Sequence, residues 1–203
     1  MATAKPTSES VLTNAVLELV LHVPDSVEPT LARPAQRAHA ISRAAARNAS
    51  ISGSLSLPPG FLGWLTVVPE LIGIWKLQAQ MVSDIAAVYG KRKTLGREQM
   101  VYCLFKHVSA QVFRDVVVRV GERVVIQQTS LKFLQNLAKT IGVQVSKTVI
   151  SKGASRFVPL LGAVTVGAYA YFDTAQVAKT AIDLFERDIV IDADTEIEKD
   201  RTH

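Results

Sequence analysis

The stretch from Pro58 to Gly90 constrains this chain most, because it is strongly apolar and yet repeatedly interrupted. Prolines and glycines at positions 58–60, 63 and 69 break the apolar run, and Glu70, Lys76 and Asp84 add charges to it. A membrane-spanning helix needs about 18 or more consecutive apolar residues, and no window of the sequence offers them. The stretch is therefore expected to lie in a protein interior or at a membrane surface.

The second half of this stretch has the pattern of an amphipathic helix from Pro69 to Tyr89. Pro69 suits a first helical turn, and Gly90 suits a left-handed C-terminal cap. Burying charged residues in lipid would cost roughly 2.5 to 3.5 kcal/mol each, so a helical bundle that leaves the polar side in solvent is favoured. That polar stripe consists of Lys76, Gln80, Ser83 and Asp84. The preceding residues, Pro58 to Val68, are interpreted as a kinked apolar segment.

Apolar residues at helical spacing predict the remaining elements. The expected helices cover 11–20 after Thr7 and Ser8, 31–49 before a linker at 50–60, 94–120, 131–149 before Gly153, and 159–185. The valine-rich stretch VFRDVVVRVGERVVIQQ also favours a β-hairpin, but a lone hairpin is marginal and its flanks are helical, so a helix ending near Gly121 is predicted. The uncharged run 157–172 is expected to be buried, and the polar half after it is expected at the surface.

The length of 203 residues and the 48 % apolar content predict one all-α domain of about six helices over residues 1–185. Its two apolar central helices are expected to be 69–89 and 159–185. The net charge of +5 is unevenly distributed. Residues 29–156 hold 18 Lys and Arg against five acids, a net charge of +13, whereas the acidic tail 186–203 has a net charge of −4 and is typical of a solvated segment.

Two groups of basic residues are the best candidates for a binding surface. Without a binding role, both groups are simply solvated faces. With one, they attract anionic lipid headgroups, which is worth about 1 kcal/mol per basic residue. Nucleic acid is less favoured as a partner, because the groups lack interleaved aromatics. The first group is Arg33, Arg37, Arg43 and Arg47, and the second is Lys91, Arg92, Lys93 and Arg97. Phe61, Trp64 and Leu65 are the candidates for inserting beside them.

Catalytic and metal-binding patterns are weak in this sequence. The four histidines are scattered and form no metal-ligand spacing, and no phosphate-binding loop sequence is present. Cys103 and His107 stand one helical turn apart, which permits a thiol–imidazole pair, but burial of Cys103 is the favoured interpretation. An enzyme acting through Cys103, His107 or Asp84 is the third choice. We therefore expect no catalytic site, no metal and no cofactor.

Two phrases of the sequence resemble the EcsC-like family and the related hydrophobic domain appended to some bacterial GTPases. The first is QAQMVSDIAAVYG, with Ile85, Ala86, Tyr89 and Gly90 at the matching positions. The second begins at Phe157 and carries Pro159, Gly162 and Thr174, with its second glycine one residue late at Gly167. The resemblance covers about 60–185. It implies an all-helical bacterial protein, membrane-associated or accessory to membrane transport or GTPase systems.

These observations together predict a non-catalytic accessory protein at the cytoplasmic side of the inner membrane. A cytoplasmic location is expected because the N-terminus lacks a signal-peptide pattern and Cys103 is the single cysteine. Its partner would be an anionic membrane surface or a membrane protein. The alternative is a soluble interaction module of adaptor or immunity type, whose apolar groove receives a partner helix or a lipid chain. A homo-oligomer is left open.

Overall fold

The computed structural model describes residues 7–55, 63–108, 113, 117–120, 123–126, 131–153 and 167–187. Its elements are α1 (Ser8–Leu21), α2 (Pro34–Leu55), α3 (Gly63–Val88), α4 (Arg97–Phe105), β1 (Val117–Val120), β2 (Arg123–Ile126) and α5 (Leu131–Gly153). A further helix covers 167–187 and is called the C-terminal helix below. Within these residues the fold is all-α, as predicted, because the two strands contribute only four residues each.

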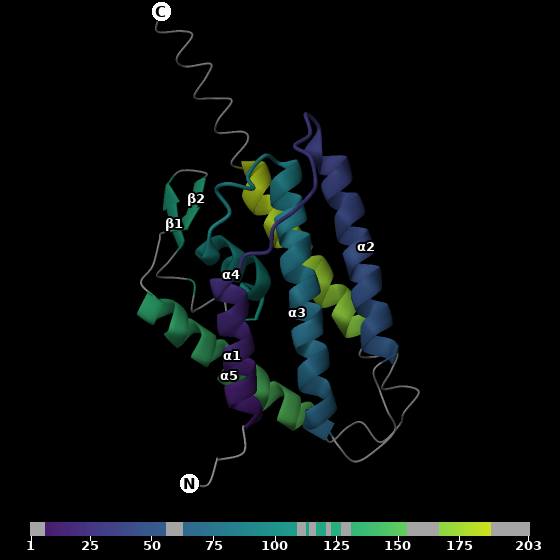
Figure 1. Ribbon diagram of the computed structural model, residues 1–203, viewed down its shortest axis with the longest axis vertical. Coiled ribbons are helices and arrows are strands. Elements are labelled where there is room, and N and C mark those ends of the chain that lie inside the picture. The colour runs from purple at the N-terminus through teal and green to yellow at the C-terminus, as the bar shows by residue number, and fades with distance from the viewer. Residues whose placement is uncertain are drawn as a thin grey trace, which may run out of the picture.

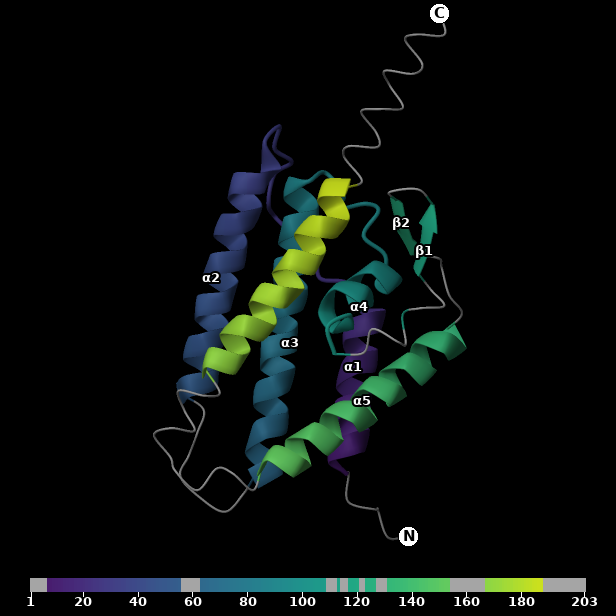
Figure 2. The same cartoon turned by 180° about the vertical axis from the view of Figure 1, so that it is seen from behind.

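Helix α3 lies at the centre of the bundle, with α2 on one side, α1 and α5 on the other, and the C-terminal helix behind it (Figure 1). Its apolar side is buried as the sequence predicts, and the Trp75 ring meets the Phe105 ring of α4 edge to face at 5.2 Å between centroids. Figure 2, which views the bundle from behind, shows the C-terminal helix crossing in front of α3. The central position of α3 brings its polar stripe close to the segments that surround it.

Local signals mark several helix ends correctly. Thr7 caps α1, since its Oγ1 accepts a hydrogen bond from the backbone N–H of Ser10 at 3.2 Å. Gly90 has φ +74°, the left-handed conformation expected at the end of α3. The predicted helix that ends at Gly153 is α5. These positions confirm that capping residues and glycines define boundaries that a single sequence reveals.

The interpretation of Pro69 as a helix start is wrong. Helix α3 begins at Gly63, so Pro69 lies inside it, and 63–68 are helical rather than part of a kinked segment. An internal proline costs about 3 kcal/mol, partly through the lost backbone hydrogen bond. Burial of Val68 in the main core helps to offset that cost, while Pro69 itself lies exposed. Residues 58–62 of the predicted segment lie outside the described part of the chain.

The predicted linker at 50–60 is also partly wrong, because α2 continues to Leu55. Pro34 stands in its first turn, as expected. Its C-terminal part is held by a small apolar cluster in which Ala49 meets Ile74 of α3 and Ala170 of the C-terminal helix. The helix thus continues past the point where serine and glycine become frequent.

The long helix predicted over 94–120 is contradicted most clearly. Helix α4 begins after Gly96, whose N–H donates to Gln99 Oε1 at 2.9 Å, and it ends at Phe105. Strands β1 and β2 then pair antiparallel, with Val117 opposite Ile126 and Val120 opposite Arg123. The rejected hairpin is thus present, because β-branched residues favour strands and a glycine-led pair of residues suits a tight hairpin connection.

The burial expected along the C-terminal helix is partly wrong: Gln176, Lys179 and Asp183 of its polar half lie at the surface as predicted, but apolar residues of that half are buried and aromatic residues before it are exposed. Tyr169 and Phe172, from the uncharged run, are 58 % and 67 % exposed. The half expected at the surface supplies a buried stripe at helical spacing, which includes Val177, Ala181 and Phe185. Amphipathic spacing, rather than the absence of charge, therefore determines which part of this helix enters the core. Pro159 and Gly162 lie outside the described residues.

Candidate anion-binding surface and the linker that supports it

The linker between α1 and α2 is residues 22–33, and its part from 24 to 31 covers much of the polar stripe of α3. The Ser83 hydroxyl donates to the backbone carbonyl of Pro24 at 2.5 Å, and Gln80 Nε2 donates to the backbone carbonyl of Asp25 at 2.9 Å. Farther along, the N–H of Leu31 donates to the carbonyl of Val88 at 3.0 Å. The expectation that this stripe faces solvent is wrong for Ser83, which is buried, and for Asp84, which is half-buried.

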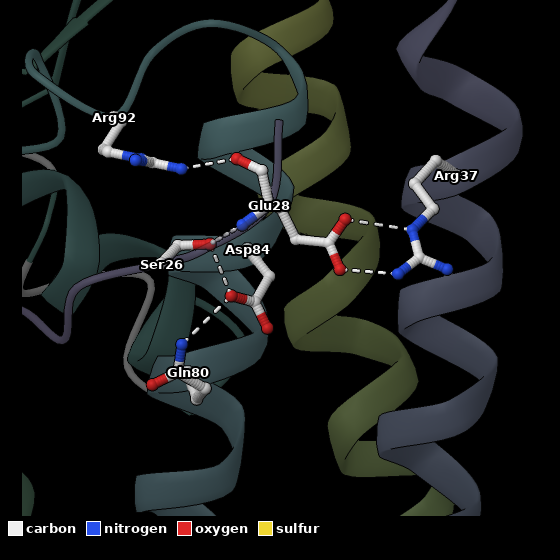
Figure 3. A network of polar contacts seen from close by, with 6 residues as sticks. All are labelled: Ser26, Glu28, Arg37, Gln80, Asp84 and Arg92. Atoms are coloured by element: carbon white, nitrogen blue, oxygen red, sulfur yellow. Dashed lines mark hydrogen bonds and ion pairs between the residues drawn. The ribbon is translucent and has the colours of Figure 1, made fainter. Parts of the chain in front are cut away.

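Ser26 is the centre of this contact and is only 3 % exposed. Its hydroxyl donates to Asp84 Oδ1 at 2.6 Å and accepts from the N–H of Glu28 at 3.2 Å (Figure 3). Gln80 Nε2 donates to the same Asp84 oxygen at 3.0 Å. Because the buried hydroxyl has both its donor and its acceptor capacity used, it fixes the course of the linker along α3.

Glu28 joins the linker to α2 and to the loop after α3. Arg37 donates to its two carboxylate oxygens, through Nε at 3.0 Å and Nη2 at 2.5 Å, in a bidentate ion pair. Arg92 donates to its backbone carbonyl. The hydrogen bond from Arg37 lowers the pKa of Glu28, against the opposing effect of burial. Two of the eight predicted binding residues, Arg37 and Arg92, are therefore used to hold the bundle together; we call these contacts the Glu28 clamp.

The other basic residues are distributed over two neighbouring surfaces. Arg43 and Arg47 are exposed on α2, with Ile51, 57 % exposed, one further turn along; their spacing of four places all three on one helix face, the α2 outer face. Arg33 and Lys93 are exposed at the end of the bundle where α2 starts and α3 finishes (Figure 1), and Arg97 is exposed at the start of α4, which the loop after α3 reaches. We call this second set the basic end. Lys91 lies beside it and is half-buried.

Charge along α2 is one-sided. Its 22 residues include three arginines and no aspartate or glutamate, and the sequence has no acid between Glu28 and Glu70. Exposed arginines on such a helix create a field of one sign, which attracts anions over roughly one Debye length, about 8 Å at physiological salt. The α2 outer face is thus electrostatically suited to a polyanionic surface.

The three apolar candidates for insertion are not placed as contacts. Phe61 lies outside the described residues, and Trp64 and Leu65 fall in the first turn of α3, where only the backbone is described. Exposed aromatic residues that the sequence interpretation had buried, Tyr169 and Phe172, lie instead on the C-terminal helix. The sequence does contain a signal for this exposure: apolar residues at helical spacing farther along the helix mark its buried side, and Tyr169 and Phe172 lie off that side.

An open cavity of about 420 Å³ lies between α2 and α3. Ile41, Ala45, Leu77 and Met81 supply apolar lining, and the polar residues Glu28, Arg37, Gln80 and Asp84 also line it. The interaction-module alternative expects such a cavity between the two central helices; this one lies between α3 and α2. Its mixed lining suits a ligand with an apolar body and a polar group.

A second polar cluster lies between α3, α4 and the C-terminal helix. His107 Nε2 and Asp173 Oδ1 are 2.7 Å apart, and Gln78 Nε2 donates to Asp173 Oδ2 at 2.7 Å and to Thr174 Oγ1 at 3.1 Å. Cys103 is fully buried, and burial strongly raises the pKa of its thiol, so the reactive thiolate is disfavoured. His107 thus serves as a partner of Asp173, which supports the interpretation of Cys103 as a core residue.

Across the part of the chain that the structure describes, no three His, Cys, Asp or Glu side chains gather into a group that could hold a metal ion. Among the described helices, none combines the length and the apolar composition that crossing a membrane requires. Comparison with family models, curated proteins and solved structures finds no match. The structure defines an all-α helical bundle with a small hairpin, and the EcsC-like resemblance stays a prediction from the quoted residues.

Proposed function

We propose that this chain is a non-catalytic accessory protein that binds peripherally to an anionic membrane surface. The observation that carries the proposal is the α2 outer face, on which Arg43, Arg47 and Ile51 are exposed on a helix without acids. The basic end adds three more exposed cationic side chains, Arg33, Lys93 and Arg97. Basic residues attract the headgroups, and an exposed apolar side chain beside them adds burial in the interface.

The number of available basic residues predicts weak, reversible binding. Of the eight predicted residues, Arg37 and Arg92 are occupied by Glu28 and Lys91 is half-buried, which leaves the five exposed arginines and lysines of the two surfaces. At about 1 kcal/mol each near an anionic leaflet, they supply roughly 5 kcal/mol. That free energy corresponds to a dissociation constant between about 1 mM and 0.1 mM. Binding of this strength depends on salt and on lipid charge, as expected of a peripheral protein.

Co-sedimentation with vesicles tests this proposal. Binding to phosphatidylcholine vesicles should rise as phosphatidylserine is added and fall as salt is added. Replacing Arg43 and Arg47 with glutamine removes about 2 kcal/mol, and binding should weaken about thirtyfold. The matched control removes the same charge from exposed positions of α5, Lys139→Gln and Lys147→Gln. Absence of binding at low salt, or an equal loss in the control, contradicts the proposal.

The cavity between α2 and α3 favours a second candidate function, capture of an apolar chain by a soluble interaction module. A fluorescent fatty acid is a suitable probe, because its chain would contact Leu77 and Met81 while its carboxylate meets polar groups. Ala44 lines the cavity and is exposed, so Ala44→Phe should block the probe without disturbing the core. Ala35→Phe, at an exposed position that is not part of the lining, is the control. Equal binding by both variants removes this candidate.

A further inference from the structure

The last residues of the chain have a charge opposite to that of the basic end. Residues 188–203 contain six acids and two basic residues, a net charge of −4. The basic end presents three exposed cationic residues, and the surrounding sequence from 29 to 156 has a net charge of +13. Groups of opposite charge on the same molecule attract each other when the distance between them is within about one Debye length. Where the acidic segment starts is therefore decisive.

The C-terminal helix carries this segment to the basic end. The helix finishes at 187 at the same end of the bundle as the loop after α3 and the start of α2 (Figures 1 and 2). Burial raises the pKa of Tyr89, which immediately precedes that loop, and the charge of Glu186 in the last turn of the C-terminal helix adds to the shift. Sixteen residues can extend over roughly 50 Å, so the acidic segment has ample length to reach Arg33, Lys93 and Arg97.

We propose that the acidic segment 188–203 docks on the basic end, at Arg33, Lys93 and Arg97, and that an anionic surface must displace it to bind there. Docking needs only the charges within the chain, whereas the competition rests on the proposed function. The segment thus acts as a built-in competitor that makes membrane binding selective for highly charged surfaces.

Covalent attachment makes this weak contact effective. A handful of solvent-exposed charge pairs, at about 0.2 to 1 kcal/mol each, gives a contact with an intrinsic dissociation constant near or above 1 mM. Attachment through a short stretch of chain supplies an effective concentration of the order of millimolar. The basic end is then covered for about half of the time at low salt. Because the attraction is screened, coverage should fall as salt is added.

Lysine footprinting of the 203-residue chain tests the docking without any membrane. Acetylation of Lys93 by a small reagent, followed by mass spectrometry, should be about twofold slower in the wild type than in a variant whose six acids in 188–203 become Asn or Gln. Lys139 and Lys147 of α5 are internal controls and should react equally in both proteins. Salt should remove the difference. Equal Lys93 rates at low salt overturn the proposal.

Vesicle binding by the same two proteins separates this inference from the proposed function. The neutralised variant should bind phosphatidylserine-containing vesicles at least twofold more tightly than the wild type. Protection of Lys93 with no vesicle binding by either protein supports the docking and contradicts the membrane function. Vesicle binding without protection of Lys93 contradicts the docking alone. Circular dichroism of the variant confirms that its helix content is unchanged.

Discussion

Gly142 and Gly73 are both helical glycines, yet replacing each with alanine should have opposite effects on stability. Gly142 lies in α5 where that helix crosses α1, and a Cβ atom there would stand 2.9 Å from the backbone nitrogen of Thr13 and 3.0 Å from its Cα, besides meeting its hydroxyl. Gly73 lies exposed on α3, and a Cβ atom there would have no neighbour within 4 Å. The same chemical change thus meets a helix backbone at one position and solvent at the other.

The magnitudes follow from two terms. Alanine in place of glycine within a helix gains up to about 1 kcal/mol of stability, and at Gly73 nothing opposes that gain. At Gly142 the same gain is opposed by overpacking, which costs typically 1 to 3 kcal/mol. The upper part of that range applies because backbone atoms of α1 can yield only if the whole helix moves. We expect Gly142→Ala to lose about 1 to 2 kcal/mol and Gly73→Ala to gain about 0.5 to 1 kcal/mol.

Urea unfolding followed by circular dichroism measures both variants against the wild type. In a chain of this size, 1 kcal/mol shifts the thermal midpoint by about 2 to 4 °C, so a thermal scan gives an independent reading. The midpoint should fall for Gly142→Ala and rise for Gly73→Ala. If Gly142→Ala is as stable as the wild type, α1 and α5 do not pack as closely as the structure places them.

Three further changes test the linker and the core. Ser26→Ala should lower the free energy of unfolding by about 2 kcal/mol, because the N–H of Glu28 and an oxygen of Asp84 lose their buried partner; the control Ser42→Ala, which removes a bond within α2, should change it by less than about 0.5 kcal/mol. The lowered pKa of Glu28 means that its stabilisation is present above the ordinary value of 4.5 and is lost as pH falls through the lower folded value. Stability should therefore decline less steeply in acid for Glu28→Gln, and coincident pH curves would contradict this. Cys103 should react with a thiol reagent only as fast as the protein opens, so rapid labelling of the native protein would show that it is accessible.

Predictability along this chain follows the range of the interactions that decide each element. The start of α1 at Thr7 and the turn at Gly90 depend on residues within a few positions, so the sequence reveals them. The start of α3 depends on burial of Val68 in the core, which opposes the local signal of Pro69. Propensity and capping describe the chain alone, and they fail where distant segments supply the stabilising contact.

The hairpin illustrates the opposite error. Its β-branched residues and the Gly121-Glu122 connection are local signals, and they predict the observed pairing of Val120 with Arg123. Two other considerations favour a helix there: the neighbouring segments are helical, and an isolated hairpin is marginally stable. Continuity with neighbouring elements proved a weaker guide than the residues of the segment itself.

The candidate site was predictable in its charges and not in its contacts. Counting basic residues identifies the exposed Arg43 and Arg47, since charge is a property of the sequence. The pairing of Arg37 with Glu28, and the cover that the linker provides over Ser83, join residues far apart or on different elements. One sequence signal does point to Glu28: it is the acid that immediately precedes a long stretch without any.

The Glu28 clamp divides the predicted binding residues by role, and this division can be measured. Arg37→Gln removes a bidentate ion pair from a side chain that is 49 % exposed, so it should lower the urea midpoint slightly. Because Glu28 already neutralises this arginine, the same change should weaken vesicle binding little. Arg47→Gln should have the reverse profile, with a vesicle affinity about five times lower and an unchanged urea midpoint. If both variants lose the same affinity at unchanged stability, net charge alone determines binding, and the assignment of separate roles fails.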